Sequence, residues 1–204
     1  MSNLSDVIGG AHMYGSLTNI LFVNDRFCNA NSAIFFNNAS SLKVPSGVFF
    51  SGDFTITVWI YLKAALIPDA SRLIDFGNGN YTDNIFVKFF NSMKISYCIS
   101  INSTTAWTYE ISTYSLLELN KWFHVTLTLS GTTGYVYVNG SLAATSATIV
   151  PRNVLRNINY IGKIKQFAIF DDLKFYQGAM SQTQILNDYI ASSNNGIILF
   201  FSKI

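Results

Sequence analysis

The sequence predicts an all-β fold in which two antiparallel sheets pack face to face as a sandwich, with one short C-terminal helix. Three observations predict this fold. Apolar and polar residues alternate in many short segments rich in Thr, Val, Ile, Tyr and Phe, which is the pattern of β-strands. Gly, Asn and Ser fill the joins between these segments, which is typical of a sandwich rather than an alternating α/β chain. Only residues 181–192 have the apolar spacing of a helix.

The first half of the chain contains many of the predicted strands. In FTITVWIYL, residues 54–62, Ile56, Val58 and Ile60 fall on one face, whereas the intervening Thr, Trp and Tyr residues fall on the other. The opening residues 1–10 show no strand pattern. The other strands expected in this half are residues 33–36, 41–44, 72–75, 85–90, 94–101 and 107–111.

A three-stranded meander is predicted in the middle of the chain. Apolar residues alternate from Phe123 to Leu129, and the stretch SGTTG then turns the chain into the strand from Tyr135 to Val138. Asn139-Gly140 follows, and this dipeptide is the strongest short signal for a hairpin because both of its residues accept a positive φ. Two consecutive hairpins are therefore expected here.

The last part of the chain combines strands with the predicted helix. Strands are expected at residues 159–162 and 167–176. The helix has Ser181 as its N-cap and is ended by residues 194–196. No linker or charge run divides the chain, so the prediction is a single domain over residues 1–204. The expected apolar stripe of the helix consists of Ile185, Leu186, Tyr189 and Ile190.

The bulk composition excludes several kinds of partner. A net charge of +2 without a Lys/Arg cluster provides no field for nucleic acid or acidic lipid, so no nucleic-acid binding is expected. No apolar run has the length of a membrane span, and residues 1–20 show no signal peptide, so no membrane insertion is expected. Asn-x-Ser/Thr sequons favour an extracellular or particle surface, although an Asn-rich chain contains some by chance. The sequons are at Asn3, Asn38, Asn80, Asn102 and Asn139.

The two cysteines offer neither a disulfide framework nor a metal motif. Cys98 lies inside an apolar strand pattern and is expected to be a buried free thiol. The alternative is a single bridge between Cys98 and Cys28 in an oxidising compartment.

The order of the motifs resembles a known family. The pieces NSAIFFNNASSLKVP, FTITVWIYL, RLIDFGNGNYTDNIFVKF, NKWFHVTLTLSGTTGYVYVNGSLAAT, NYIGK and FDDLKFYQGAMSQTQILNDY extend from about Arg26 to Tyr189. Together they are similar to the laminin G-like and pentraxin-like domains of the concanavalin A-like lectin/glucanase superfamily. The resemblance implies a jelly-roll sandwich with one concave sheet.

The two ends of the chain depart from that family order. Family members commonly begin with a Gly-apolar-apolar-aromatic strand, followed by Asn-Leu-x-Asp and a Gly-rich turn. Here SNLSDVIGG, residues 2–10, supplies only the second half, and the first half is at the C-terminus. The resemblance therefore implies that the C-terminal strand completes the sheet. It does so within its own chain as a circular permutation, or in a neighbouring copy by strand exchange; alternatively, both ends belong to an edge pair. The strand is Gly196, Ile197, Ile198, Leu199, Phe200 and Phe201.

The acidic residues do not predict a glycosidase. Such enzymes need two carboxylates on either side of the sugar bond, yet the only glutamates are Glu110 and Glu118, and no Glu-x-Asp-x-Glu motif is present. Asp171 and Asp172 are sequential, so on a regular strand they face opposite sides. No Gly-x-Ser-x-Gly turn is present either. The chain is therefore expected not to be an enzyme.

One loop is rich in the oxygen ligands that calcium prefers. The spacing does not match a helix-loop-helix calcium site, but the resemblance to laminin G-like domains implies a rim site at which such ligands gather. Asn and Asp are also ordinary turn residues, and Asn37-Asn38 stands where relatives have Asp-Gly. No cofactor is required, and calcium is the one metal that this loop suggests. The candidate ligands are Asp75, Asn78, Asn80, Asp83 and Asn84.

Aromatic and polar side chains suggest recognition rather than catalysis. Rings can stack on a sugar face, and the candidates for ligand contact are Tyr81 and Trp107 in loops and His124 on a polar strand face. The predicted function is a noncatalytic module that binds a glycan or a protein partner at a cell, matrix or particle surface. The alternative is a structural protein whose C-terminal strand joins copies into a homo-oligomer or array.

Overall fold

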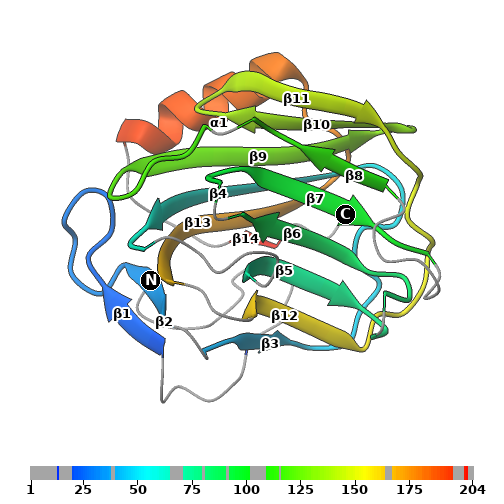
Figure 1. Ribbon diagram of the computed structural model, residues 1–204, viewed down its shortest axis with the longest axis horizontal. Helices are drawn as coiled ribbons and strands as arrows, with labels where there is room; N and C mark the ends of the chain where they lie inside the picture. The colour runs from blue at the N-terminus through cyan, green and yellow to red at the C-terminus, as the bar shows by residue number, and fades with distance from the viewer. Residues whose placement is uncertain are drawn as a thin grey trace.

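Two β-sheets, stacked face to face, make up the computed structural model of the protein (Figure 1). The named strands pair antiparallel except at the short β14, and a single described helix lies outside the sheets, so the predicted all-β sandwich is confirmed. The structure describes residues 13, 20–37, 40–64, 71–79, 81–90, 92–101, 109–114, 116–163, 167–194 and 200–201. None of the helices in this part of the chain has the length and apolarity of a membrane span.

The larger sheet has eight strands and contains the predicted meander. Its order begins at β1 and passes through β2, β13, β4, β9 and β10 to β11. Asn139 and Gly140 turn β10 into β11 with positive φ values of 50° and 76°, as the Asn-Gly dipeptide predicts. The strands are β1 (Ile20–Val23), β2 (Ala33–Asn37), β4 (Phe54–Leu62), β9 (Trp122–Ser130), β10 (Thr133–Val138), β11 (Ser141–Ala147), β13 (Phe167–Gln177) and β14 (Phe200–Phe201).

The smaller sheet has six strands and faces the viewer in Figure 1. Its order is β3, β12, β5, β6, β7 and β8, so that β12 is inserted from late in the chain between two early strands. The strands are β3 (Leu42–Val44), β5 (Ser71–Gly77), β6 (Ile85–Phe89), β7 (Ile95–Ile99), β8 (Tyr109–Ser112) and β12 (Ile158–Lys163).

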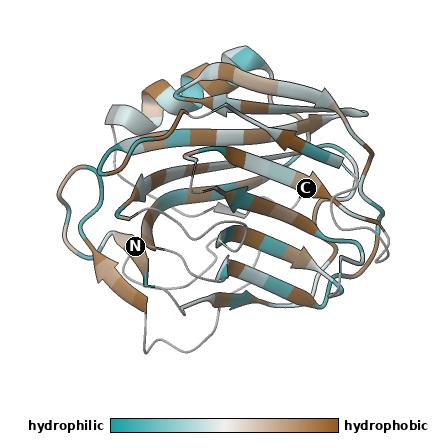
Figure 2. Cartoon of the chain, viewed as in Figure 1, coloured by the Kyte–Doolittle hydropathy of each residue, from teal (hydrophilic) through white to brown (hydrophobic). Residues whose placement is uncertain are grey.

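The hydrophobic core lies between the two sheets. Alternate residues of the central strands point into it, and hydrophilic and hydrophobic bands accordingly alternate along β5 and β12 in Figure 2. Tyr97 joins the sheets, because its hydroxyl donates a hydrogen bond of 2.9 Å across the core to the carbonyl oxygen of Thr128. Gly134 makes room for this contact, since a Cβ at that position would lie 2.1 Å from the Tyr97 hydroxyl oxygen.

Helix α1 (Gln182–Asn194) packs on the outer face of the eight-stranded sheet. Ser181 is its N-cap as predicted, and it exchanges hydrogen bonds with Gln184 in a capping box. The predicted apolar stripe is only partly buried: Ile185 is fully covered, whereas Leu186 and Ile190 are 42% and 49% exposed. The outer face of the sheet beneath α1 is polar, so the helix meets it largely with polar and aromatic side chains.

A β-bulge in β13 corrects the prediction that Asp171 and Asp172 face opposite sides. The register with β4 shifts between Asp171 and Lys174, and Asp172 has a φ of +47°. Both carboxylates therefore accept hydrogen bonds from the guanidinium of Arg26, which lies in the turn between β1 and β2. The same guanidinium also donates to the carbonyl oxygen of Ser192 in α1, so Arg26 ties the turn to both β13 and the helix.

The C-terminal strand pairs with β13 of its own chain. Phe200 and Phe201 run parallel to Lys174 and Phe175, and they add to the edge of β13 that β2 occupies further along. Residues 196–199 of the predicted strand lie outside the described residues. Exchange of this strand between copies of the chain stays a prediction.

Candidate functional site

The outer face of the six-stranded sheet carries two rows of polar and aromatic side chains. Neighbouring residues within each row are paired across adjacent strands, while the residues between the rows, such as Ile74 and Val87, point into the core. In the part of the chain that the structure describes, no helix covers this face, since α1 lies on the other sheet. The first row is Lys163, Arg72, Lys88, Ser96 and Ser112, and the second is Lys43, Tyr160, Asp75, Phe86, Cys98 and Glu110.

Asp75 is the centre of this face. The residue is only 1% exposed, and its carboxylate accepts hydrogen bonds from Arg72 Nη1 at 2.6 Å and from Lys163 Nζ at 2.9 Å. Asn84 Nδ2 donates to the second carboxylate oxygen at 2.8 Å. Burial opposes ionisation of Asp75, but the two cations and the amide outweigh it and hold its pKa below the ordinary value. Asp75 is therefore an ionised acceptor on this face.

A glycine allows Asn84 to reach Asp75. A Cβ at position 77 would lie 2.3 Å from the side-chain carbon Cγ of Asn84, so only glycine at the end of β5 leaves space for this amide. The position of Asn84 therefore depends on the absence of a side chain at Gly77.

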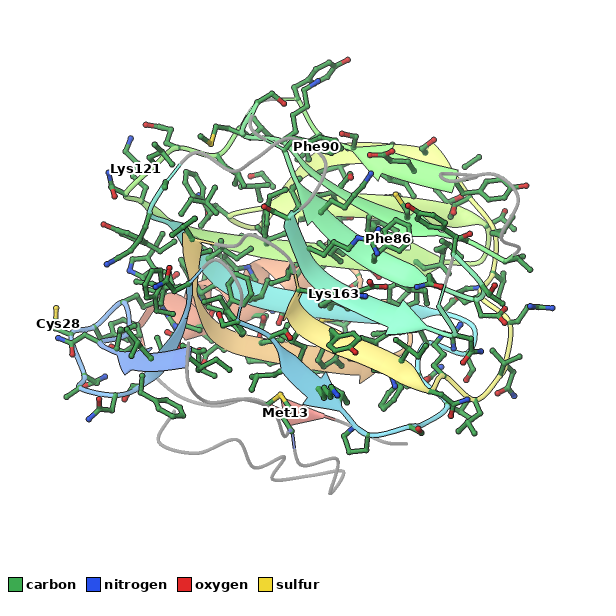
Figure 3. The ribbon with its side chains drawn as sticks, turned by 60° about the horizontal axis from the view of Figure 1, so that its bottom comes forward. Met13, Cys28, Phe86, Phe90, Lys121 and Lys163 are labelled. Carbon is green, nitrogen blue, oxygen red and sulfur yellow. The ribbon has the colours of Figure 1, made fainter. Side chains whose placement is uncertain are left out.

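Aromatic rings hold the cations of this face in position. The guanidinium of Arg72 lies 4.7 Å from the ring centroid of Phe86 and 5.7 Å from that of Tyr81, and Lys163 Nζ lies 4.6 Å from that of Tyr160. Figure 3 shows Lys163 and Phe86 over this sheet. Among the described residues, Arg72 Nε is buried and has no hydrogen-bond partner, so the fixed guanidinium keeps a spare donor.

Further along the same face, the side chains form an internal ion pair around a thiol. Lys88 Nζ lies 3.5 Å from Glu110 Oε1. Burial, the largest influence, raises the pKa of the neighbouring Cys98 thiol to about 12. Cys98 is a free buried thiol as expected, and Cys28 is a free exposed one, so the alternative of a bridge between them is wrong.

The loop predicted to hold calcium divides into two groups with different partners. Asp75 and Asn84 meet on the sheet face, whereas Asn78 Oδ1 accepts a hydrogen bond from the backbone N–H of Asn157. The carboxylate of Asp83 accepts from Arg152 Nε at 2.5 Å. Asn78 and Asp83 thus anchor the segment before β12, and Asn80 lies outside the described residues.

This donor set does not fit a calcium ion. The oxygens of Asp75 already accept from two cations and an amide, and those of Asp83 and Asn78 point to other partners. No group of three His, Cys, Asp or Glu side chains suited to a metal occurs among the described residues. Tyr81 and Asp83 have positive φ values of 62° and 56°, in agreement with the turn-forming interpretation of this loop.

The three residues predicted to contact a ligand have different surroundings. Tyr81 lies beside Arg72 on the candidate face, and Trp107 lies outside the described residues. His124 is 1% exposed beneath α1, with Nε2 3.3 Å from Asp188 Oδ2, and burial is the main cause of its lowered pKa. The structure therefore corrects the choice of His124, because a side chain enclosed between sheet and helix does not reach a surface ligand.

Comparison with known proteins defines the class of this fold. A laminin G family model, described as the concanavalin A-like lectin/glucanases superfamily, matches residues 36–186. The chain belongs to this family, which confirms the resemblance seen in the sequence motifs. No match is found among curated protein sequences.

Solved structures with the same fold include toxin and enzyme domains. The binding domain of botulinum neurotoxin serotype G has a TM-score of 0.67 and 18% identity, over 90% of this chain and 47% of its own. The binding domain of botulinum neurotoxin DC, described in complex with SialylT, has a TM-score of 0.66 and 14% identity, over 88% and 45%. Trypanosoma rangeli sialidase has a TM-score of 0.60 and 19% identity, over 79% and 28%. The chain thus spans less than half of each of these proteins.

Proposed function

We propose that this protein is a noncatalytic recognition module that binds a glycan or a protein partner through the outer face of the six-stranded sheet. We place it at a cell, matrix or particle surface. One observation carries the proposal: charged, amide and aromatic side chains converge around the buried carboxylate of Asp75 on a face that no described helix covers. Two buried polar atoms on the same face, Arg72 Nε and Ser96 Oγ, have no hydrogen-bond partner among the described residues, and this also favours a ligand site.

Within this proposal, a glycan is the preferred ligand class. Sugar sites combine rings that stack on the pyranose face with polar groups that bond its hydroxyls. Tyr160 and Tyr81 are partly exposed beside Lys163 and Arg72, which supplies both kinds of contact. The printed description of the neurotoxin DC domain with SialylT adds support at the level of the fold.

The state of the carboxyl groups supports a noncatalytic role. A glycosidase acid needs a raised pKa, yet the pKa of Asp75 is lowered and its oxygens are engaged by three donors. Glu110 pairs with Lys88, and Glu118 pairs with Lys121 elsewhere on the surface. Asp171 has a pKa raised to about 6, chiefly by burial, but its side chain is enclosed and bound to Arg26.

The alternative of a structural protein built by strand exchange is less favoured, because β14 pairs within its own chain. Sedimentation of the purified chain over a wide concentration range tests it, and a stable monomer would exclude strand exchange. A stepwise ladder of oligomers that collapses when residues 196–204 are deleted would support it.

A glycan array with the purified chain tests the recognition function, followed by titration calorimetry of the best ligand. The variant Tyr160→Ala removes a ring from the candidate face and should weaken binding about tenfold, in line with the loss of one stacking contact. Trp122→Phe is a matched control, since Trp122 lies on the outer face of the other sheet. Equal loss in both variants, or binding unaffected by Tyr160→Ala, would place the site elsewhere.

A further inference from the structure

We infer that the ligand of this face is an anionic glycan, held by a carboxylate or sulfate group through Arg72, Lys163 and Lys43 and without a metal ion. The inference rests on the proposed recognition function and names the chemical class of its ligand. It is carried by the balance of charge on the face and by hydrogen-bond donors that the protein leaves unused.

The positive charge of the chain is concentrated on this face. Its two rows contain four cations and two carboxylates, an excess of two positive charges, and the whole chain has a net charge of +2. The positive and negative charges in the remainder of the protein are therefore equal in number. The cations are Lys43, Arg72, Lys88 and Lys163, and the carboxylates are Asp75 and Glu110.

Lys163 and Arg72 have more hydrogen-bond donors than Asp75 accepts from them. Lys163 has three N–H donors and uses one on Asp75, and Arg72 has five and uses one on the same oxygen. Arg72 Nε is without a partner among the described residues, and the side chain of Lys163 is 31% exposed. An incoming oxyanion can therefore reach the free donors of the exposed Lys163 ammonium without displacing Asp75.

The spacing of these cations suits an oxyanion. Lys163 and Arg72 are directly opposite each other on β12 and β5, so their backbones are about 5 Å apart. Lys43 is opposite Tyr160 on the next strand and is exposed. Arg72 Nη1 and Lys163 Nζ bond the same Asp75 oxygen, so the two charged groups lie close enough together to bond two oxygens of one carboxylate or sulfate, and the ring of Tyr160 lies beside Lys163 for the sugar.

The outer face of the other sheet does not offer an equivalent site. Among the described residues, the cations near α1 are matched by acids and enclosed: Arg26 binds Asp171 and Asp172, and Lys174 binds Asp188. The excess of cations over carboxylates on the six-stranded sheet is therefore the feature that selects the ligand.

The test is an array in which sialylated, uronic-acid and sulfated glycans each stand beside their uncharged parent. We expect the charged member of at least one pair to bind ten times more tightly or better, with equal binding in calcium and in EDTA. Affinity should fall as sodium chloride is raised, because exposed charges are screened. The sialylated and sulfated arms distinguish a carboxylate ligand from a sulfate ligand.

Variants locate the interaction. Lys163→Gln and Lys43→Gln should each lower the affinity for the charged glycan about tenfold or more, the range of a charge-assisted hydrogen bond, and lower the affinity for the uncharged parent by a smaller factor. Lys121→Gln is the matched control, because Lys121 is exposed, pairs with Glu118 and lies well away from Lys163 in Figure 3. Circular dichroism confirms that each variant is folded.

The outcomes separate this inference from the proposed function. Charged and uncharged members that bind equally would overturn the inference and leave the recognition function standing. Binding of an anionic glycan that is lost in EDTA would overturn the metal-free site. Failure to bind any glycan on the array would overturn both the inference and the glycan form of the proposed function.

Discussion

The contact between Gly134 and Tyr97 gives a sharp test of how the two sheets are held together. Gly134→Ala introduces a Cβ 2.1 Å from the Tyr97 hydroxyl oxygen and 2.9 Å from Ile111 Cδ1. Non-bonded heavy atoms normally stay about 3.5–4.0 Å apart, so the hydroxyl must move by more than about 1 Å. That movement breaks its 2.9 Å hydrogen bond to the Thr128 carbonyl oxygen.

The expected cost has two parts. Overpacking of a filled core costs about 1–3 kcal/mol, and a buried hydrogen bond left unmade costs about 1–3 kcal/mol. We expect Gly134→Ala to lower the free energy of unfolding by about 2–6 kcal/mol. In an open strand the same substitution would be neutral or stabilising by up to about 1 kcal/mol, so the sign of the effect is informative.

Urea unfolding followed by circular dichroism measures this effect, and a double-mutant cycle assigns it. Tyr97→Phe removes the hydroxyl that the new methyl group would meet and should cost about 1–2 kcal/mol alone. The double variant should then be more stable than Gly134→Ala alone. Additive losses, or a loss below about 0.5 kcal/mol for Gly134→Ala, would refute the proposed packing.

Three further predictions concern the buried charges and the candidate face. The folded pKa of Asp171 is raised to about 6 from 3.8, so its ionisation costs up to about 3 kcal/mol above pH 6, a cost that fades as the pH falls to about 4. Asp171→Asn should remove this gain of stability on acidification, as thermal melts between pH 4 and 7 would show; an unchanged pH profile contradicts it. Asp188 has a pKa lowered to about 2, so its ionised form contributes about 2 kcal/mol to the stability of the fold above pH 4, and this contribution is lost as the pH falls to 2. Asp188→Asn should therefore make the melting temperature depend less on pH over that range. Gly77→Ala should displace Asn84 and weaken ligand binding more than it weakens folding, measured by calorimetry beside urea unfolding; equal losses in both would argue against a role in the site.

Local patterns in the sequence predict much of this fold because the forces that set them are local. Alternation along residues 54–62 and 122–130 predicts β4 and β9, since one face of each strand must meet the core. Asn139-Gly140 predicts its hairpin because the dipeptide accepts positive φ. By contrast, β1 escapes prediction: its four residues, Ile20–Val23, are all apolar and show no alternation.

Tertiary arrangement accounts for what the sequence does not predict. Nothing in the local pattern around Asp171 and Asp172 signals the bulge that turns both carboxylates toward Arg26, because the partner is 145 residues away. Likewise His124 looks like an exposed residue on a polar strand face until α1 covers it. The period-two alternation of apolar and polar residues assigns a residue to one face of a strand, but it does not say what packs on that face.

In the candidate site, too, the sequence predicts the residues of one local segment but not the partners that the tertiary fold brings to them. The oxygen donors Asp75 and Asn84 are recognisable in one loop-rich stretch, but the cations that engage Asp75 are not. Arg72 lies three residues before Asp75 and shares its face because the register with β6 shifts between Arg72 and Ile74, and Lys163 arrives from β12 through the register of the sheet. By regular alternation Arg72 and Asp75 would face opposite sides, as would Tyr160 and Lys163, so the RLID and NYIGK segments do not signal this cluster.

The unequal environments of the two thiols have a practical consequence. Cys98 is buried with a pKa of about 12, so it reacts little with thiol reagents near neutral pH, whereas Cys28 is exposed in the turn between β1 and β2. A maleimide should therefore attach a single dye, biotin or sensor surface at one known place without any engineered cysteine. Cys28 lies at the periphery of the molecule, apart from Lys163 in Figure 3, so a protein immobilised through it would present its six-stranded sheet to the solution.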